Sequence, residues 1–68
     1  MEFELNGKEF IELNKLLKIS GLVESGGQAN VFITEGAVVV NNATETAKRK
    51  KIRTGDIVLF RDQEITVK

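Results

Sequence analysis

The sequence contains neither cysteine nor histidine, and these two absences remove several classes of function. Without cysteine there is no disulfide, no thiolate metal site and no cysteine nucleophile. Without histidine, a zinc site would need carboxylates alone, and the commonest general base is missing. We therefore expect no metal ion and no other cofactor.

Long apolar runs, proline and repeats are absent as well. No run approaches the roughly 20 residues that cross a bilayer, and the amino end does not resemble a signal peptide, so we expect a cytoplasmic protein with no membrane partner. Nothing marks a domain boundary. The 68 residues are expected to form one small domain, which would bury only about 60% of its unfolded surface.

The charges balance overall but are unevenly distributed. The formal net charge is +0, yet residues 1–35 carry six acidic and three basic side chains, and residues 36–68 carry four acidic and seven basic ones. Five of those seven cations lie between Lys48 and Arg53. Because the local field depends on the distribution rather than the total, the molecule can present a basic face to a partner.

The first third of the chain predicts a strand and then a helix. Phe3 and Leu5 alternate with polar residues before the Asn6-Gly7 turn, which predicts a short half-buried strand at the edge of the sheet or covering it. Apolar residues then recur at spacings of three and four from Ile11 to Ile19. This pattern predicts an amphipathic helix that ends at Ser20-Gly21.

A second helix is predicted by Ser25 and Gln28, which have the spacing of a capping box. Gly36 stands where a left-handed residue usually ends a helix. Immediately beyond it, the β-branched run Val38–Val40 favours a buried strand. The buried face of this helix is expected to hold Ala29, Phe32 and Ile33.

The second half predicts further strands and turns. Asn41-Asn42 suits a turn because asparagine tolerates positive φ. Ala43–Lys51 predicts a strand edge followed by an exposed loop, and Arg53–Asp56 predicts another turn. A terminal hairpin is predicted around Arg61–Gln63, with Ile57, Leu59, Ile65 and Val67 as its alternating apolar residues. We expect an α+β fold of two short helices packed on a small, mainly antiparallel sheet, in the order strand, helix, helix, strands.

This ordered set of signals resembles the S-four-type RNA-binding domain, also called the αL motif. The family pattern is a leucine-rich helix ending at glycine, a second helix opened by serine, a short hydrophobic strand ending in asparagine, and a late Gly-Asp. The residues that match it, between about Ile11 and Phe60, are Leu13, Leu16, Leu17, Gly21, Ser25, Ala29, Ile33, Gly36, Val38, Val40, Asn41, Gly55 and Asp56. The extra first strand and the small size resemble the small stand-alone bacterial members.

The resemblance implies noncatalytic binding of structured RNA, with ribosomal RNA, transfer RNA or a ribosomal particle as the partner, and it leaves DNA open. Many members carry arginine near the start of the first helix and directly after the helix-opening serine. This sequence has Glu12 and Gly26 at those places, so the two contacts are not carried over. RNA would lie across the helices or be held mainly by the later cations.

The sharpest candidate for phosphate contacts is the basic segment, defined as Lys48, Arg49, Lys50, Lys51 and Arg53. Clustered cations displace condensed counterions from a phosphate backbone. The ordinary alternative is a solvated loop that keeps the protein soluble. The family resemblance favours the binding interpretation.

Weaker candidates lie on the predicted helices. The start of the second helix would expose amides at its positive end, and its glycines would let a phosphate approach closely. The alternative is a simple cap, although each glycine there costs roughly 0.5 to 1 kcal/mol against alanine. The candidates at this start are Ser25, Gly26, Gly27 and Gln28. Lys15 and Lys18 could extend the basic surface or serve only solubility, and Lys8 and Asn30 are weaker candidates still.

Neither the carboxylates nor the rings favour other chemistry. Glu45, Asp56, Asp62 and Glu64 are scattered, and so small a core is not expected to enclose the pocket of about 300 Å³ that an active site needs. We therefore expect no enzyme. With no tyrosine or tryptophan, the phenylalanines are expected in the core rather than stacked on bases, which favours recognition of folded RNA by shape and phosphate contacts.

Two other functions compete with RNA binding. A protein-interaction adaptor would use the acidic first half of the chain as its working surface. A β-grasp sulfur carrier would have a similar size, but such carriers end in Gly-Gly. This chain ends in Thr66-Val67-Lys68, so the sulfur carrier is set aside.

Overall fold

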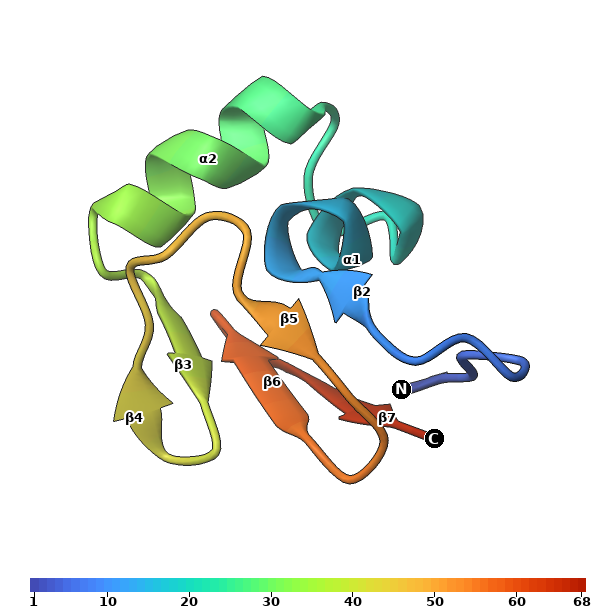
Figure 1. Ribbon diagram of the computed structural model, residues 1–68. Helices are drawn as coiled ribbons and strands as arrows, with labels where there is room; N and C mark the ends of the chain where they lie inside the picture. Colours follow the sequence, from blue (N-terminus) through green and yellow to red (C-terminus); the bar gives the residue numbers. More distant parts are fainter.

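Two short helices lie on one face of a five-stranded sheet in the computed structural model, which describes residues 1–68 (Figure 1). The chain runs through β1 (Glu2–Phe3), β2 (Ile11–Glu12), α1 (Leu13–Ile19), α2 (Gly26–Thr34), β3 (Val38–Val40), β4 (Ala43–Thr44), β5 (Lys51–Ile52), β6 (Ile57–Phe60) and β7 (Gln63–Val67). The large sheet has the order β1-β7-β6-β3-β4, and only the β1–β7 pair is parallel. The predicted α+β fold and the edge position of the first strand are confirmed.

The predicted start of the first helix is wrong. Ile11 and Glu12 form β2, which pairs antiparallel with β5 in a separate two-stranded sheet. The helix begins at Leu13, and Ile19 at its last position is 63% exposed. Alternation from Ile11 to Leu13 fits a strand as well as a helix, and only the distant partner Ile52 decides between them.

The signals for the second helix are confirmed in detail. The Ser25 Oγ accepts a hydrogen bond from the Gln28 N–H at 3.1 Å, and the Gln28 side chain accepts one from the Glu24 N–H at 2.7 Å. The glutamine therefore reaches back one residue beyond the cap itself. At the other end, Gly36 has φ +82°, a left-handed conformation that glycine adopts without strain.

The predicted turns are confirmed as well. Asn41 and Asn42 have φ of 49° and 69° and join β3 to β4, while Asn6-Gly7 also forms a turn with positive φ. The terminal hairpin of β6 and β7 turns at Arg61-Asp62. Neither helix is long and apolar enough to cross a membrane.

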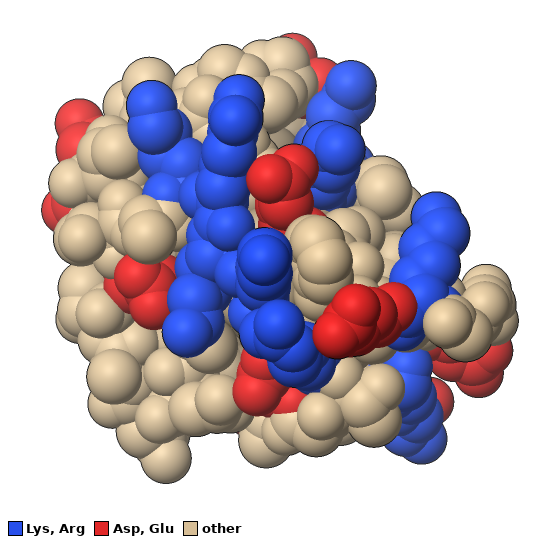
Figure 2. Space-filling model, in the orientation of Figure 1, with Lys and Arg blue, Asp and Glu red and all other residues tan.

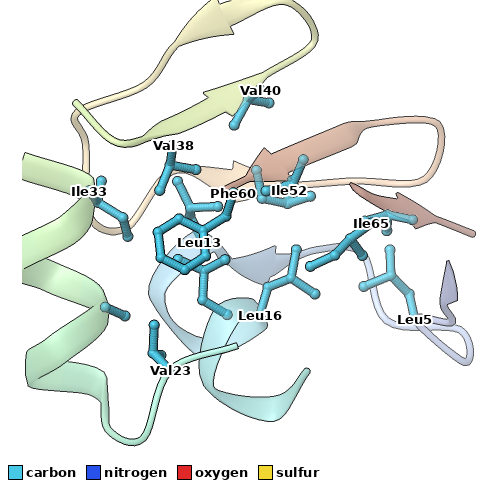
Figure 3. Packing of buried hydrophobic residues seen from close by; sticks show 14 residues of the cluster. Leu5, Leu13, Leu16, Val23, Ile33, Val38, Val40, Ile52, Phe60 and Ile65 are labelled. Atoms are coloured by element: carbon cyan, nitrogen blue, oxygen red, sulfur yellow. The ribbon is translucent and has the colours of Figure 1, made fainter. Parts of the chain in front are cut away.

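The core lies between the helices and the inner face of the large sheet (Figure 3). In that view Leu13, Ile33, Val38 and Phe60 point toward one another. On β6 the residues that reach the core are Val58 and Phe60, whereas Ile57 and Leu59, on which the hairpin was predicted, are 41% and 39% exposed on the other face. Every residue of β6 is apolar, so the pattern did not indicate which face is buried.

The expected burial of the phenylalanines is only partly correct. Phe60 is 2% exposed and belongs to the core. The other three rings are half-buried at its margin, where Phe3 and Phe32 pack against the core from β1 and α2. Phe10 lies just before β2 and contacts cations instead.

Candidate nucleic-acid interface

The backbone of the basic segment closes the start of α1. The main-chain carbonyl of Lys50 accepts a hydrogen bond from the Leu13 N–H at 2.9 Å, and that of Lys48 accepts one from the Asn14 N–H at 3.1 Å. Glu12, the residue before the helix, makes no side-chain cap. Because the first amides of a helix have no partner within the helix, these two carbonyls satisfy donors that would otherwise be left unpaired. The loop is therefore held against α1 while its side chains remain exposed.

The second half of the basic segment is anchored by β5. Ile52 is fully buried and pairs with Ile11, so Lys51 and Arg53 on either side of it point away from the core. Both cations lie over the ring of Phe10, with 5.0 Å from the Lys51 Nζ and 5.8 Å from the Arg53 Cζ to the ring centroid. Cation–π attraction gathers the two charges at one place on the surface.

The turn after the segment is held by Asp56. Its carboxylate accepts the Arg53 N–H at 2.8 Å and the Asn41 side-chain amide at 3.0 Å. Glu45 similarly accepts the Ala47 N–H at 3.1 Å on the way into the segment. Each of these two carboxylates therefore caps a turn through backbone N–H groups. No group of three acidic residues is placed to hold a metal ion.

All five cations of the basic segment are exposed and lack an ion-pair partner. The two ion pairs of the molecule are Lys15–Glu12 at 3.4 Å and Lys68–Glu2 at 2.8 Å. Figure 2 shows lysine and arginine side chains gathered in a band over the face crossed by the segment between β4 and β5. Cations beside the positive end of a helix are mildly unfavourable for folding, so this placement brings no stability.

Of the helix lysines, Lys15 lies beside the basic segment. It pairs with Glu12, which stands directly across from Lys51 in the β2–β5 ladder. Lys18 is exposed in the last turn of α1, away from that ladder. Glu12 thus occupies the place of a family arginine and offsets part of the positive charge at this edge.

The start of α2 is a separate place on the surface. The N–H groups of Gly26 and Gly27 donate to no protein acceptor, and a Cβ added at Gly26 would meet nothing within 4 Å. Neither glycine is therefore required by packing. No hydrogen bond or ion pair joins Ser25 or Gln28 to the basic segment.

Sequence reasoning missed two contacts made by polar side chains of the helices and of the β6–β7 turn. Asn14 on α1 donates its side-chain amide to the Asn30 side-chain oxygen at 3.0 Å, which links the two helices. Arg61 in the β6–β7 turn lies over two rings, those of Phe32 and Phe60. An isolated arginine far from Phe32 in the sequence gives no signal of this contact, which only the fold creates.

The surface carries a groove that lies outside the core, whose small size was expected to enclose no active-site pocket. An open groove of about 570 Å³ lies between the amino-terminal segment and α1. It is surface-formed rather than enclosed by the core, which is why core size did not predict it. Its apolar side includes Phe3, Phe10 and Ile19, and its charged side chains of both signs are Glu4, Lys8, Glu12 and Lys15.

Known proteins are similar to this chain in sequence, and one solved structure is similar to it in fold. "Putative RNA-binding protein YbcJ" of Escherichia coli (strain K12) is 45% identical over 65 residues, covering 96% of this chain and 93% of that protein. "Probable ribosome maturation protein RlbA" of Bacillus subtilis (strain 168) is 36% identical over 50 residues, covering 74% and 70%. The solution structure of E. coli YbcJ, described as revealing an αL motif involved in RNA binding, superposes with a TM-score of 0.75 at 44% identity and covers 97% of this chain and 84% of that one.

The family model described as the S4 domain matches residues 3–68. It is the S-four-type family that the sequence resembles, and the helix pair on a mostly antiparallel sheet is its αL motif. This chain belongs to the S4 domain family.

Proposed function

We propose that this chain binds structured RNA without catalysis, as a single RNA-binding domain, and that the basic segment supplies its main phosphate contacts. The observation that carries the proposal is a row of five exposed cations without ion-pair partners, held in place by backbone bonds to α1 and by the ring of Phe10. Concentrated, unpaired cations neutralise several phosphates at once, and each neutralised phosphate releases condensed counterions from the RNA. The names of YbcJ and RlbA support the same function.

The partner that we propose is ribosomal or transfer RNA in the cytoplasm, with a maturing ribosomal particle as its setting. The relative named for ribosome maturation supports this choice. None of the four phenylalanine rings is exposed, and the half-buried Phe10 is already covered by two cations. A surface of this kind favours folded RNA, read by shape and phosphate position, over a single strand stacked on aromatic side chains.

Binding to a structured ribosomal RNA fragment, a single strand and duplex DNA, each across a salt series, tests the proposal. The comparison is a variant in which all five cations of the basic segment become glutamate, after its fold has been checked by circular dichroism. We expect the wild type to prefer structured RNA with a log–log salt slope of several units, and the variant to lose binding. Wild-type binding no tighter than roughly 10⁻⁴ M at physiological salt would refute the proposal.

The open groove favours a second candidate function, a protein-interaction adaptor that uses the acidic first half. Ile19 is the most exposed of the large apolar residues, at 63%, and it lines the groove. Apolar side chains gathered along a groove, here Phe3, Phe10 and Ile19, are typical of a protein contact. For this function, Ile19→Asp should abolish co-purification of a ribosomal protein, whereas charge reversal of the basic segment should leave co-purification intact. Loss of co-purification on charge reversal, with Ile19→Asp unaffected, supports RNA binding alone.

A further inference from the structure

Resting on the RNA-binding function proposed above, we propose that Arg61 is a second phosphate contact, whose guanidinium binds the RNA backbone beside the basic segment. Arg61 is exposed in the turn between β6 and β7 and is separate in sequence from the other cations. Four observations support the assignment: its orientation on two rings, its lack of partners within the protein, its left-handed backbone and its place in the fold.

The guanidinium is oriented by aromatic packing. Its Cζ lies 4.8 Å from the ring centroid of Phe32 and 5.0 Å from that of Phe60. The centroids of the two rings are 5.1 Å apart at an interplanar angle of 55°, and Phe60 is 2% exposed, so the rings that contact the guanidinium are fixed by core packing. An arginine held in this way has lost part of its side-chain freedom before any ligand arrives, which lowers the entropic cost of binding.

The donors of Arg61 are left unused by the protein. Neither of the ion pairs of the molecule involves it, although Asp62 follows directly, and no hydrogen bond from its side chain is present. Packing on aromatic rings leaves the N–H edge of a guanidinium available, and that planar fork matches two oxygens of one phosphate.

The backbone at Arg61 also points to a role beyond folding. Its φ is 56°, in the left-handed region where asparagine and glycine are favoured. The comparable turn between β3 and β4 uses two asparagines, with φ of 49° and 69°. A long cation at such a position costs conformational energy that a turn alone does not require.

The sheet places Arg61 beside the chain that leads into the basic segment. Phe60 at the end of β6 pairs with Val38 at the start of β3, and the Val38 carbonyl accepts the Glu45 N–H at 2.9 Å. Since β4 and β6 both run antiparallel to β3, both strands finish beside the first residues of β3, one on each side of it. Neighbouring strands are about 4.8 Å apart, so the ends of β6 and β4 are separated by about 10 Å. The basic segment begins four residues after β4, and an RNA backbone that contacts it can extend to Arg61.

The experiment measures RNA binding of the full chain across a salt series for wild type, Arg61→Met and Arg61→Lys. Methionine keeps apolar contact with the rings but has neither the charge nor the planar guanidinium, whereas lysine keeps the charge without the guanidinium. We expect Arg61→Met to lower the log–log salt slope by about one and to weaken binding about tenfold near 150 mM salt. Arg61→Lys should restore the slope but not the full affinity.

Lys68→Met is the matched control, because it removes one charge directly after β7, next to the opposite edge strand β1, and it should leave slope and affinity unchanged. The side-chain Nε–H resonance of Arg61 in the wild type gives a readout that needs no variant, and it should shift as RNA is added. An Arg61 resonance that does not shift at RNA saturation, or an Arg61→Met variant that binds RNA with wild-type affinity and salt slope, overturns the assignment. The variant of the basic segment tests the proposed RNA-binding function separately.

Discussion

Neutralising the three loop cations Lys48, Arg49 and Lys50 with glutamine should weaken RNA binding in a salt-dependent way while leaving the fold intact. Their side chains are exposed and form no ion pair or hydrogen bond, so glutamine removes charge without breaking a contact. The carbonyls that close the start of α1 belong to the main chain and are kept. Lys51 and Arg53 are left unchanged because both pack on Phe10.

The expected magnitude follows from counterion release. Each lost phosphate contact should reduce the log–log salt slope by about 0.7 to 0.9, so three contacts should reduce it by about 2 to 3. Between 50 and 200 mM salt, the affinity advantage of the wild type over the variant should therefore shrink about 20- to 40-fold. The free energy of unfolding should stay constant or rise by up to about 1 kcal/mol, because cations leave the positive end of α1.

Fluorescence anisotropy with a labelled ribosomal RNA fragment at five salt concentrations measures the slope, and urea unfolding measures stability. The control variant combines Asn42→Asp with Lys68→Gln, which lowers the net charge by about two at exposed positions outside the basic segment. Its slope should change by less than about one. The loop variant lowers the net charge by about three, so a control change about two-thirds as large as that of the loop variant would show that overall charge rather than the basic segment governs binding, and would refute the reasoning.

Three further outcomes are expected. In the wild type, the Lys68 ammonium holds the pKa of the Glu2 carboxyl below its usual range, and in Lys68→Met an NMR titration should show this pKa near its ordinary value. The stability that the ion pair adds in the wild type is present above the ordinary pKa and is lost as the pH falls through the lowered pKa. Ile52→Val should lower the free energy of unfolding in urea by about 0.5 to 1.5 kcal/mol, because Ile52 is fully buried. Gly26→Ala should raise it by up to about 1 kcal/mol, since the added Cβ meets open space, whereas Gly36→Ala, at φ +82°, should lower it by about 1 to 2 kcal/mol in the same assay.

The elements that could be predicted are those set by short-range interactions. The capping box at Ser25, the left-handed Gly36 and the Asn41-Asn42 turn each depend on hydrogen bonds or φ values within a few residues. The concentration of cations between Lys48 and Arg53 is likewise visible in the residue order. These local preferences were enough to order the helices and most strands and to identify the family.

What only the tertiary structure decided involves residues far apart in the chain. The pairing of Ile11 with Ile52 turned the expected first turn of α1 into a strand, and it brought the carbonyls of the basic segment onto the helix start. The stacking of Arg61 on Phe32 and the groove beside Ile19 arise in the same way. Periodicity and propensity describe neighbours in sequence, whereas these contacts depend on strand register and helix packing, which are decided by burial of the whole core at once.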